Sequence, residues 1–348
     1  MARGKPRLRV GVVGATGMVG RELLDSLQRR KFPVGELLAF SSGRARQTVR
    51  FNSRALPAPG VDERALASCD LVFFVSADEV SERLAPGLAR RGIWCVDDSS
   101  AFRQDPEVPL VIPEVNASAL ARDKKLIAGP NCTMTGLAVA GWPLHRRVGV
   151  RAVRLASYQA VSGAGKAALG EFFSQTRLLV TKLDSSGKAP LLAAAKAQAL
   201  PRAIAFNVIP QVGGFDEKGE SSEERKVAAE LRKIWSAPAL AVSVTAVRVP
   251  VVRGHSLAAW LTMARPTSPV EAGPLLRAAP GLTVSKEGDY PTPLTCKGPG
   301  PVYAGRLRQG AAADELCVWI VSDNLQKGAA LNSVQIAEEL LKRRWLAA

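Results

Sequence analysis

The sequence is poor in histidine, in aromatic residues and in closely spaced cysteines, and it has no long apolar run. Its 348 residues include two histidines, and aromatic residues make up 5%. The five cysteines are odd in number and contain no C-x-x-C pair, which argues against a disulfide framework and against a zinc ribbon. No apolar stretch reaches the ~18 residues that span a bilayer, and no secretory signal pattern is found. These absences predict a cytoplasmic, reduced protein without a metal site or a membrane partner.

Acidic residues are also few relative to basic ones. The chain has 47 Lys and Arg against 31 Asp and Glu, a net charge of +16. Such an excess fits a nucleic-acid partner, an anionic small substrate or an arginine-rich surface. Because the chain lacks the interleaved aromatic residues of a single-strand binding platform, we expect a solvated surface that attracts anionic ligands, and no nucleic-acid partner.

The length and the 47% hydrophobic content indicate a globular chain of about two domains. Apolar β-rich runs alternate with helical patterns at 8–14, 18–30, 36–42, 71–77, 79–91, 94–98 and 125–128. This alternation predicts an α/β, Rossmann-type domain whose parallel sheet is covered on both faces. Strand-like runs at 151–160, 242–252 and 316–322, with helical runs at 167–183 and 222–235, predict an α+β second domain. The helical run 326–345 is expected to pack on the first domain, so we assign 1–131 plus 325–348 to the first domain and 132–324 to the second.

A glycine-rich turn joins the first predicted strand to the first predicted helix. Residues 11–20 read GVVGATGMVG, with a glycine at every third position. Glycine lets backbone N–H groups approach a pyrophosphate at a helix N-terminus, although it also serves ordinary tight turns. In this context we predict nucleotide binding by Gly14, Thr16, Gly17, Met18 and Val19.

The end of the second predicted strand reads AFSSGRA at 39–45. An NAD site usually has an acidic residue there for the ribose 2′-hydroxyl. Ser41, Ser42 and Arg44 suit a 2′-phosphate instead, so NADP(H) is favoured over NAD; a polar turn with an incidental arginine is the alternative.

One cysteine precedes a helical run directly. Cys132 lies in GPNCT at 129–133, ahead of the helical pattern 134–144. A thiolate at a helix N-terminus is stabilised by the helix dipole, which makes Cys132 a candidate nucleophile. A buried, inert thiol is the alternative, and the residues themselves leave both open.

The two histidines limit the choice of a partner base. His145 lies near the expected end of a helix and is interpreted as a surface or capping residue. His255 follows a strand-like run and a glycine, where we expect a loop. A Cys–His pair suits nucleophilic attack and proton transfer near neutral pH.

Eight motifs, in order, resemble the aspartate-β-semialdehyde dehydrogenase family between about residues 7 and 340. They are GATGMVG at 14–20, GPNCT at 129–133, YQAVSGAG at 158–165, NVIPQ at 207–211, EERK at 223–226, RVP at 248–250, GH at 254–255 and SDNLQKGAALN at 322–332. The resemblance implies NADP-dependent reductive dephosphorylation of L-4-aspartyl phosphate to L-aspartate 4-semialdehyde through a cysteine thioester. This reaction serves the biosynthesis of Lys, Thr, Met and Ile and of diaminopimelate. The resemblance also implies a homodimer joined through the second domain.

The same resemblance implies a role for each matching residue. Cys132 would be the nucleophile, His255 the general acid/base, and Gln159 would orient substrate. Substrate contacts are implied for Arg103, Asn131 and Lys226 at the phosphate, for Arg248 at the α-carboxylate and for Glu223 at the ammonium. Contacts to the nicotinamide half of the cofactor are implied for Ser162, Gly163 and Asn324.

Two departures and two alternatives accompany this assignment. The family's second-strand arginine precedes Ser-Ala-Gly, whereas Arg44 follows Ser-Ser-Gly, and the stretch after Gln211 is richer in glycine than in the family. The alternatives are a catalytically altered paralogue and another phosphorylating reductase, such as N-acetyl-glutamyl-phosphate reductase or glyceraldehyde-3-phosphate dehydrogenase. The presence of Cys132 and His255 disfavours the first. Glu223, which would receive a free amine, disfavours an N-acetylated substrate.

Overall fold

Short apolar strands in the first third of the chain pair side by side in parallel. The computed structural model describes residues 7–44, 46–181, 197–296 and 300–346. One sheet contains β1 (Leu8–Val13), β2 (Val34–Phe40), β5 (Leu71–Phe74), β6 (Trp94–Asp97) and β7 (Leu126–Ala128), in the order β2-β1-β5-β6-β7. Every ladder in this sheet is parallel. Such a sheet must be covered on both faces, and its strands are accordingly apolar with few polar side chains.

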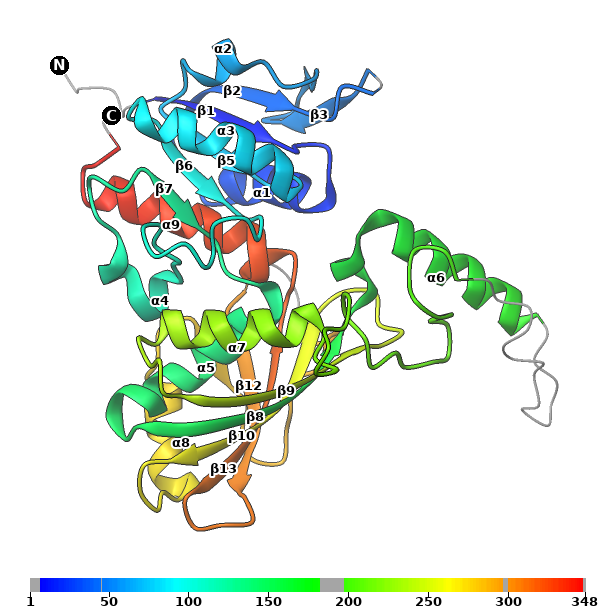
Figure 1. The fold of residues 1–348 in the computed structure, drawn as a ribbon, viewed down its shortest axis with the longest axis vertical. Coiled ribbons are helices and arrows are strands. Elements are labelled where there is room, and N and C mark those ends of the chain that lie inside the picture. The colour runs from blue at the N-terminus through cyan, green and yellow to red at the C-terminus, as the bar shows by residue number, and fades with distance from the viewer. Residues whose placement is uncertain (1–6, 45, 182–196, 297–299, 347–348) are drawn as a thin grey trace. The chain divides into compact units, whose positions relative to one another are not determined.

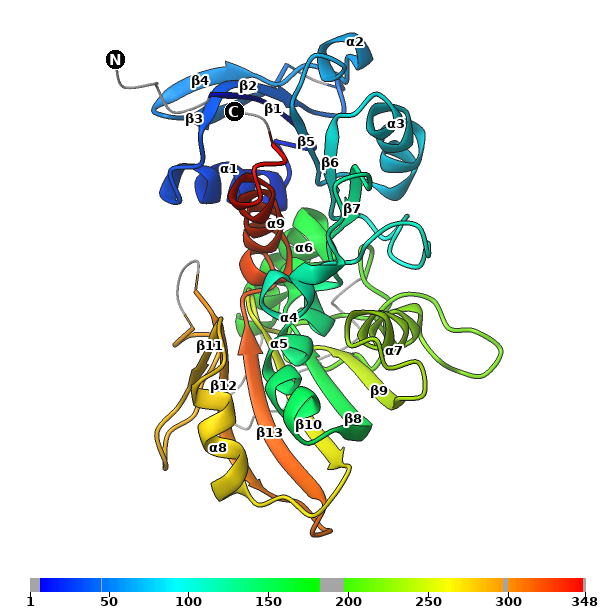
Figure 2. The same ribbon diagram turned by 90° about the vertical axis from the view of Figure 1, so that its left-hand side faces the viewer.

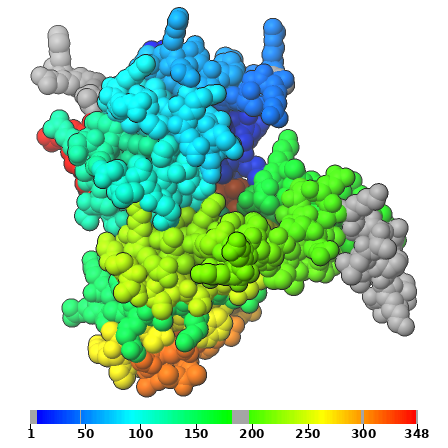
Figure 3. Space-filling model, in the orientation of Figure 1, coloured from blue at the N-terminus to red at the C-terminus, as the bar shows by residue number. Residues whose placement is uncertain are grey.

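Two crossover helices cover opposite faces of this sheet. Helix α1 (Met18–Arg29) connects β1 to β2, whereas α3 (Asp78–Arg90) connects β5 to β6 on the other side of β1. Right-handed crossovers in opposite directions place α1 and α3 on opposite faces, as Figures 1 and 2 show. Helix α3 buries Leu84 and Leu88, and its outer side forms part of the surface seen in cyan in Figure 3. The strand order reverses between β1 and β5, which is where doubly wound sheets bind ligands.

The end of the chain returns to this first unit. A π-helical turn (Gln326–Ala330) leads into α9 (Leu331–Lys342), and α9 packs beside α1. Its Val334, Ile336, Ala337 and Leu340 are buried in the same core cluster as Leu23 of α1. The packing of this helix on the first domain is thereby confirmed. The first compact unit comprises residues 1–135, 233–237 and 325–348.

The second unit is built on a mixed six-stranded sheet and comprises residues 136–232 and 238–324. Its order is β11-β12-β13-β10-β8-β9, from β8 (Val150–Gln159), β9 (Ala241–Arg248), β10 (His255–Met263), β11 (Leu282–Val284), β12 (Val302–Gln309) and β13 (Glu315–Ser322). Strand β8 is parallel to β9 and antiparallel to β10, which in turn is antiparallel to β13. The α+β class expected for this part of the chain is confirmed.

Helices of the second unit lie against one face of that sheet or beside it. They are α5 (Cys132–Arg147), which begins in the first unit, α6 (Gly165–Val180), α7 (Ser222–Ile234) and α8 (Pro269–Arg277). Gly136 of α5 lies close to Ile320 and Ser322, so α5 covers the sheet face that these two side chains share. None of the described helices is long and apolar enough to cross a membrane.

Several elements differ from the sequence-based expectations. The sequence analysis did not predict the hairpin of β3 (Thr48–Phe51) and β4 (Arg54–Pro57) or the short helices α2 (Glu63–Leu66) and α4 (Pro113–Asn116). It also did not predict β10, β11, β12 and α8. The strand expected at 242–252 ends at Arg248, because Pro250 cannot donate a ladder hydrogen bond. The expectation of a loop at His255 is wrong, since this residue is the first of β10. Residue 183, the expected end of α6, lies outside the described residues.

The glycine turn after β1 depends on close backbone approaches. Gly14 has φ +90°, and a methyl group there would lie 2.5 Å from the carbonyl oxygen of Val75, which follows β5. A methyl group on Gly20, in the first turns of α1, would lie 2.3 Å from the oxygen of Gly14. Both positions therefore require glycine for α1 to start where it does.

We expect Gly20→Ala to lower the free energy of unfolding by about 1–3 kcal/mol, because the new methyl group overpacks the turn. Gly87→Ala in α3 is the matched control, since nothing lies within 4 Å of a methyl group there. The control should gain about 0.5–1 kcal/mol from helix propensity. Urea denaturation followed by circular dichroism measures both; equal midpoints for the two variants would contradict the close packing at Gly20.

Candidate functional site

The predicted residues of the first unit lie along one edge of its sheet. Gly14 follows β1, Ser41 follows β2, the loop with Arg103 follows β6, and Asn131 and Cys132 follow β7. The strands are parallel, so these positions all lie at the carboxyl edge, where ligands bind in such sheets. Along the strand order, the glycine turn and Ser41 lie toward the β2 side, and Cys132 lies toward the β7 side.

The glycine turn fits a bound pyrophosphate. Gly17 is the N-cap of α1 in extended conformation, with no side chain that caps the first turn. Gly17 is exposed and its neighbours Thr16, Met18 and Val19 are partly buried, so the backbone of Gly17 lies at the surface of the turn. A helix N-terminus without a side-chain cap keeps its N–H groups for an anion.

The polar side chains of the turn after β2 differ in burial. Ser41 is buried, and its hydroxyl donates to the oxygen of Ala58 at 2.7 Å and accepts from the N–H of Gly43 at 3.2 Å. Ser41 therefore holds the shape of the turn. Ser42 and Arg44 are exposed beyond it, and no acidic residue occupies the end of β2.

Cys132 is the first residue of α5. Asn131 accepts hydrogen bonds at Oδ1 from the N–H groups of Thr133 at 2.8 Å and Met134 at 3.1 Å, so it caps the helix. Cys132 is partly buried and lies within the first turn, where the positive end of the helix dipole favours a thiolate. The predicted start of a helix at this cysteine is confirmed.

The loop after β6 is held by its own polar side chains. Asp97 is fully buried and accepts from the hydroxyls of Ser81 at 2.7 Å and Ser99 at 2.6 Å. Arg103 is largely buried, and its Nη2 donates to the oxygen of Asp98 at 2.7 Å. A guanidinium fixed on a constrained loop is suited to recognise a phosphate.

The second unit also gathers its predicted residues at one edge of a sheet. Gln159 ends β8 and pairs with Arg248, the last residue of the parallel β9. His255 begins the antiparallel β10 opposite Ser322, the last residue of β13, and Asn324 follows two residues later. Gln159, Arg248 and His255 share the sheet face that α5 covers, because they alternate in phase with the buried Leu155, Ala246 and Leu257.

The backbone of one residue, Ala160, binds both His255 and Arg248. The N–H of Ala160 donates to His255 Nδ1 at 3.1 Å, and the carbonyl of Ala160 accepts from Arg248 Nη1 at 2.8 Å. Because Nδ1 is an acceptor, the proton of the neutral ring is at Nε2. Gly163 lies against both groups, since a methyl group there would be 2.9 Å from Arg248 Nη1 and 3.3 Å from His255 Nε2.

Gln159 is joined to Glu223 of α7. Its amide nitrogen donates to Glu223 Oε1 at 3.1 Å and to Ser157 Oγ at 3.2 Å. Lys226 is one helical turn further along α7, so it and Glu223 project from the same side of the helix. An amide, a carboxylate and an ammonium group are thereby available at this sheet edge.

Ser162 and Asn324 are also brought together. The hydroxyl of Ser162 donates to Asn324 Oδ1 at 3.2 Å, or accepts from its Nδ2 at 3.0 Å. Asn324 Oδ1 accepts from the N–H of Gly254 at 2.9 Å. The second unit thus connects Ser162, Asn324 and the residue that precedes His255.

Burial controls the protonation of the imidazole. His255 is 1% exposed, and burial, together with the nearby charge of Arg248, lowers its pKa from 6.5 to about 3. The ring is therefore neutral at pH 7 and presents Nε2–H as a donor. His145, in the last turn of α5, is half-buried and accepts at Nδ1 from the N–H of Val150 at 3.2 Å, which agrees with a capping residue.

Two residues to which the sequence analysis gave no role, Lys327 and Gly328, belong to the turn that contacts Cys132. Lys327 is fully buried in the π-helical turn, and Gly328 beside it lies against Cys132. Both fall within the 322–332 motif, but lysine is normally exposed, so its sequence context carried no signal of burial. A glycine inside a helical pattern was the one available sign of a close contact.

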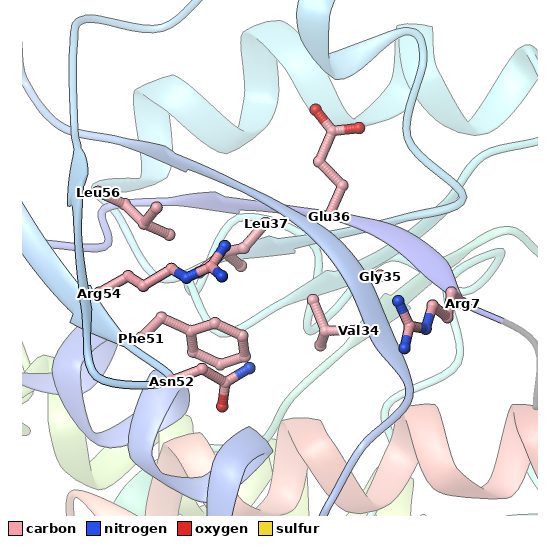
Figure 4. A pocket seen from close by; sticks show the side chains of 9 residues that line it. All are labelled: Arg7, Val34, Gly35, Glu36, Leu37, Phe51, Asn52, Arg54 and Leu56. Atoms are coloured by element: carbon pink, nitrogen blue, oxygen red, sulfur yellow. The ribbon is translucent and has the colours of Figure 1, made fainter.

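A separate cavity of about 630 Å³ lies at the opposite, amino end of β2. Val34, Leu37, Phe51 and Leu56 are its apolar lining residues, and Figure 4 shows Arg54 beside Leu37 and Arg7 on the other side of Val34. It contains none of the residues predicted to bind cofactor or substrate. Among the described residues, no group of three or more His, Cys, Asp or Glu side chains is arranged to hold a metal ion.

The chain is similar to known proteins over nearly its whole length. Residues 9–122 match the family model "Semialdehyde dehydrogenase, NAD binding domain", and residues 142–327 match "Semialdehyde dehydrogenase, dimerisation domain". The chain is 40% identical to an aspartate-semialdehyde dehydrogenase of Shewanella violacea, over 96% of this chain and 97% of the relative. It is 43% identical to the one of Streptomyces akiyoshiensis, over 95% and 98%. A solved structure of aspartate semialdehyde dehydrogenase II from Vibrio cholerae, complexed with ASA, superposes with a TM-score of 0.91 at 36% identity, covering 97% of this chain and 99% of that chain.

The buried imidazole predicts a dependence of stability on pH. Unfolded His255 binds a proton below its ordinary pKa of 6.5, whereas the folded ring stays neutral to about pH 3. The stability that the neutral ring contributes is therefore complete above pH 6.5 and is lost as the pH falls from 6.5 toward 3. We expect His255→Gln, which keeps a hydrogen-bond acceptor, to reduce the slope of unfolding free energy against pH by up to about 1.4 kcal/mol per unit in this window.

Urea denaturation at a series of pH values between 4 and 8 measures this slope. His145→Gln is the control, because its half-buried ring should change the slope less. Identical slopes in wild type and His255→Gln would show that the imidazole is not held neutral.

Proposed function

The chain belongs to the aspartate-semialdehyde dehydrogenase family, and we propose that it catalyses the NADP-dependent reductive dephosphorylation of L-4-aspartyl phosphate to L-aspartate 4-semialdehyde. The observation that carries the proposal is the placement of the matching residues. Cys132 begins α5 at the carboxyl edge of the first sheet, and Gln159, Arg248 and His255 meet at one edge of the second. In a cell this reaction would supply the biosynthesis of Lys, Thr, Met and Ile and of diaminopimelate.

Cys132 is the proposed nucleophile. Its thiolate, stabilised by the N-terminus of α5, would attack the β-carbonyl carbon of the acyl phosphate. The C–O bond to phosphate would break with its electron pair, so inorganic phosphate leaves and a thioester remains on Cys132. Asn131 supports this step through its cap of the helix that orients the cysteine.

His255 is the proposed acid/base group, acting at Nε2. Ala160 occupies Nδ1, so only Nε2–H can face a reacting oxygen. This N–H would stabilise the oxyanion of each tetrahedral intermediate and exchange its proton as the intermediate forms and collapses. A nicotinamide cofactor supplies the hydride that reduces the thioester to the aldehyde level.

The substrate carries a phosphate, an α-carboxylate and an ammonium group, and the chain offers a partner of opposite charge for each. We assign Arg103 and Lys226 to the phosphate and Arg248 to the carboxylate, where a planar guanidinium can donate two parallel hydrogen bonds. Glu223 would receive the ammonium group. Its hydrogen bond with Gln159 supports a shared role for these two residues in orienting the substrate.

The proposed cofactor is NADP(H), bound on the first unit. The glycine turn at Gly14 and Gly17 would receive the pyrophosphate at the N-terminus of α1. The exposed Ser42 and Arg44, in the absence of an acidic residue at the end of β2, support a 2′-phosphate. Ser162, Gly163 and Asn324 would contact the nicotinamide half. A cytoplasmic location is also proposed, because the five cysteines of the sequence are odd in number and contain no C-x-x-C pair.

A homodimer through the second unit is also proposed. The sheet face opposite α5 carries Tyr158, Trp260 and Trp319, of which Tyr158 and Trp319 are in contact with ring centroids 5.5 Å apart. A hollow of about 500 Å³ on this face is lined by Arg154, Thr245 and Trp260, among others. Aromatic residues beside a charged rim are typical of the core of a protein interface, and the match to a dimerisation domain supports a second copy of this chain as the partner.

Steady-state kinetics test the activity. Purified protein should reduce NADP in the presence of aspartate semialdehyde and inorganic phosphate, and Cys132→Ala should remove the rate. Cys296→Ala, which changes another partly buried cysteine, should leave the rate within about twofold, the range of a surface substitution. No rate with the wild type, or an unchanged rate in Cys132→Ala, refutes the assignment. The same assay with NAD, and with an N-acetylated glutamate semialdehyde, decides the cofactor and tests the alternative substrate.

Sedimentation velocity tests the dimer. The wild type should sediment as twice 36.9 kDa, and Trp260→Glu should shift it to the monomer, because a charge would be buried unpaired in the interface. Val270→Glu is the control, since Val270 is 84% exposed on α8, away from this face. A wild-type monomer at micromolar concentration would count against the proposal.

A further inference from the structure

The turn at Gly328 is packed directly on the backbone of Cys132. A methyl group at position 328 would lie 2.8 Å from Cβ of Cys132, 3.0 Å from its Cα and 3.2 Å from its oxygen. Separations below 3.0 Å between carbon atoms that are not bonded are strongly repulsive, so any side chain at 328 would displace Cys132. Cβ carries Sγ directly, so the position of this turn determines where the thiol can be.

Gly328 lies in an uncommon conformation of the backbone. Residues 326–330 form a π-helical turn, in which the N–H of Ala330 donates to the oxygen of Leu325 at 3.2 Å. A π turn is less stable than α-helix and persists only where its surroundings hold it. Hydrogen bonds of the Lys327 and Gln326 side chains hold this turn in place.

The side chain of Lys327 holds the turn from within the protein. It is 1% exposed, and its three N–H groups donate to Glu114 Oε2 at 2.6 Å, Gln335 Oε1 at 2.7 Å and Asn332 Oδ1 at 2.9 Å. Glu114 Oε1 accepts from Gln335 Nε2 at 2.8 Å. Every N–H donor of the ammonium group therefore has an acceptor. A buried polar network in which every group is hydrogen-bonded makes the residues around it rigid and favours a single conformation of them.

Residues next to Lys327 also hold the turn in place, through hydrogen bonds to α1 and to the segment before α4. Gln326 accepts from the hydroxyl of Ser26 at 2.9 Å and also donates to Glu22, so it ties the turn to α1. Asn332 donates to the oxygen of Val111 at 3.0 Å, next to α4. All of these groups belong to the first unit, as does Cys132.

A second contact reaches the same loop from α9. Ser333 donates to Asp98 Oδ1 at 2.5 Å, and a methyl group at Gly129 would lie 2.3 Å from that same oxygen. Asp98 is enclosed by protein, and burial raises its pKa to about 6. The loop 129–132 is therefore packed at Gly129 against Asp98, which Ser333 of α9 binds, and at Cys132 against Gly328 of the π turn.

We propose that Lys327 and Gly328 are positioning residues for the Cys132 thiol. The hydrogen-bonded Lys327 cluster holds the π turn, and the bare backbone of Gly328 fixes Cys132 Cβ so that Sγ stays at the N-terminus of α5. The proposal rests on the function proposed above, in which Cys132 is the nucleophile. A displacement of about 1 Å is enough to remove much of an oriented reaction's advantage.

The test substitutes Gly328 by alanine and uses Gly170→Ala as the matched control. Gly170 is also helical, on α6, and has no atom within 4 Å of a methyl group. Two quantities are measured: the kinetic constants, and the rate of iodoacetamide alkylation of Cys132 against pH, followed by peptide mass spectrometry. Cys296 is an internal reference, because it is also partly buried and lies far along the chain in the second unit.

In Gly328→Ala we expect kcat to fall by about 100-fold while KM for NADP changes little, because the thiol moves and the cofactor turn does not. Alkylation of Cys132 should slow by roughly 2- to 30-fold at pH 7, the range that a helix terminus contributes to an anion. Gly170→Ala and the Cys296 signal should match the wild type. Wild-type alkylation of Cys132 in Gly328→Ala overturns the proposal, whatever happens to kcat.

A second variant keeps the test decisive if Gly328→Ala does not fold. The double variant Lys327→Met with Glu114→Gln removes both charges of the buried pair without leaving one unpaired. It should fold with a native circular dichroism spectrum and still alkylate Cys132 more slowly than the wild type. Unchanged alkylation in the folded double variant overturns the role of Lys327. Because alkylation does not require turnover, an inactive wild type would refute the proposed function and leave this test intact.

Discussion

Backbone hydrogen bonding between neighbouring strands determines where chemistry can occur in this chain. In the first sheet all four ladders are parallel, so the residues that follow β1, β2, β6 and β7 share one edge. In the second sheet β8 and β9 are parallel and β10 is antiparallel, so two strand ends and one strand start coincide. Residues as distant in sequence as Gln159 and His255 become neighbours for this reason alone. Strand pairing brings these positions together, and their side chains supply the reactive and binding groups.

Much of this arrangement was predictable from the sequence. The alternation of apolar runs and helical patterns indicated the parallel sheet, and the GVVGATGMVG run indicated the turn where the strand order reverses. The position of Cys132 at the start of α5 followed from the helical pattern that comes directly after it, at 134–144. These features are local, because each depends on residues within a few positions of one another.

Other features depend on contacts between distant residues, and the sequence did not reveal them. Strand β10 has one face buried and the other half-buried, so its sequence alternates weakly and was not predicted as a strand, and His255 was placed in a loop. The hairpin of β3 and β4 is a short element whose turn residues, Asn52 and Ser53, have positive φ without a glycine. The burial of Lys327 requires Glu114, Asn332 and Gln335 to converge. No local pattern records that convergence, since each of these residue types is normally exposed.

The last described residues of the chain belong to the core that its first residues begin. Several residues between Ala330 and Leu346 lie in one hydrophobic core cluster with Leu8, Val10 and Leu23, and α9 lies beside α1. During synthesis the sheet of the first unit can pair its strands early, with α1 on one face, but the place of α9 beside α1 stays open until residues 331–342 have left the ribosome. The second unit, formed almost entirely by residues 136–324, is complete sooner. The first unit therefore cannot be completed until the chain segment of the second unit has been made, and the π turn beside Cys132 is formed by residues that follow that segment.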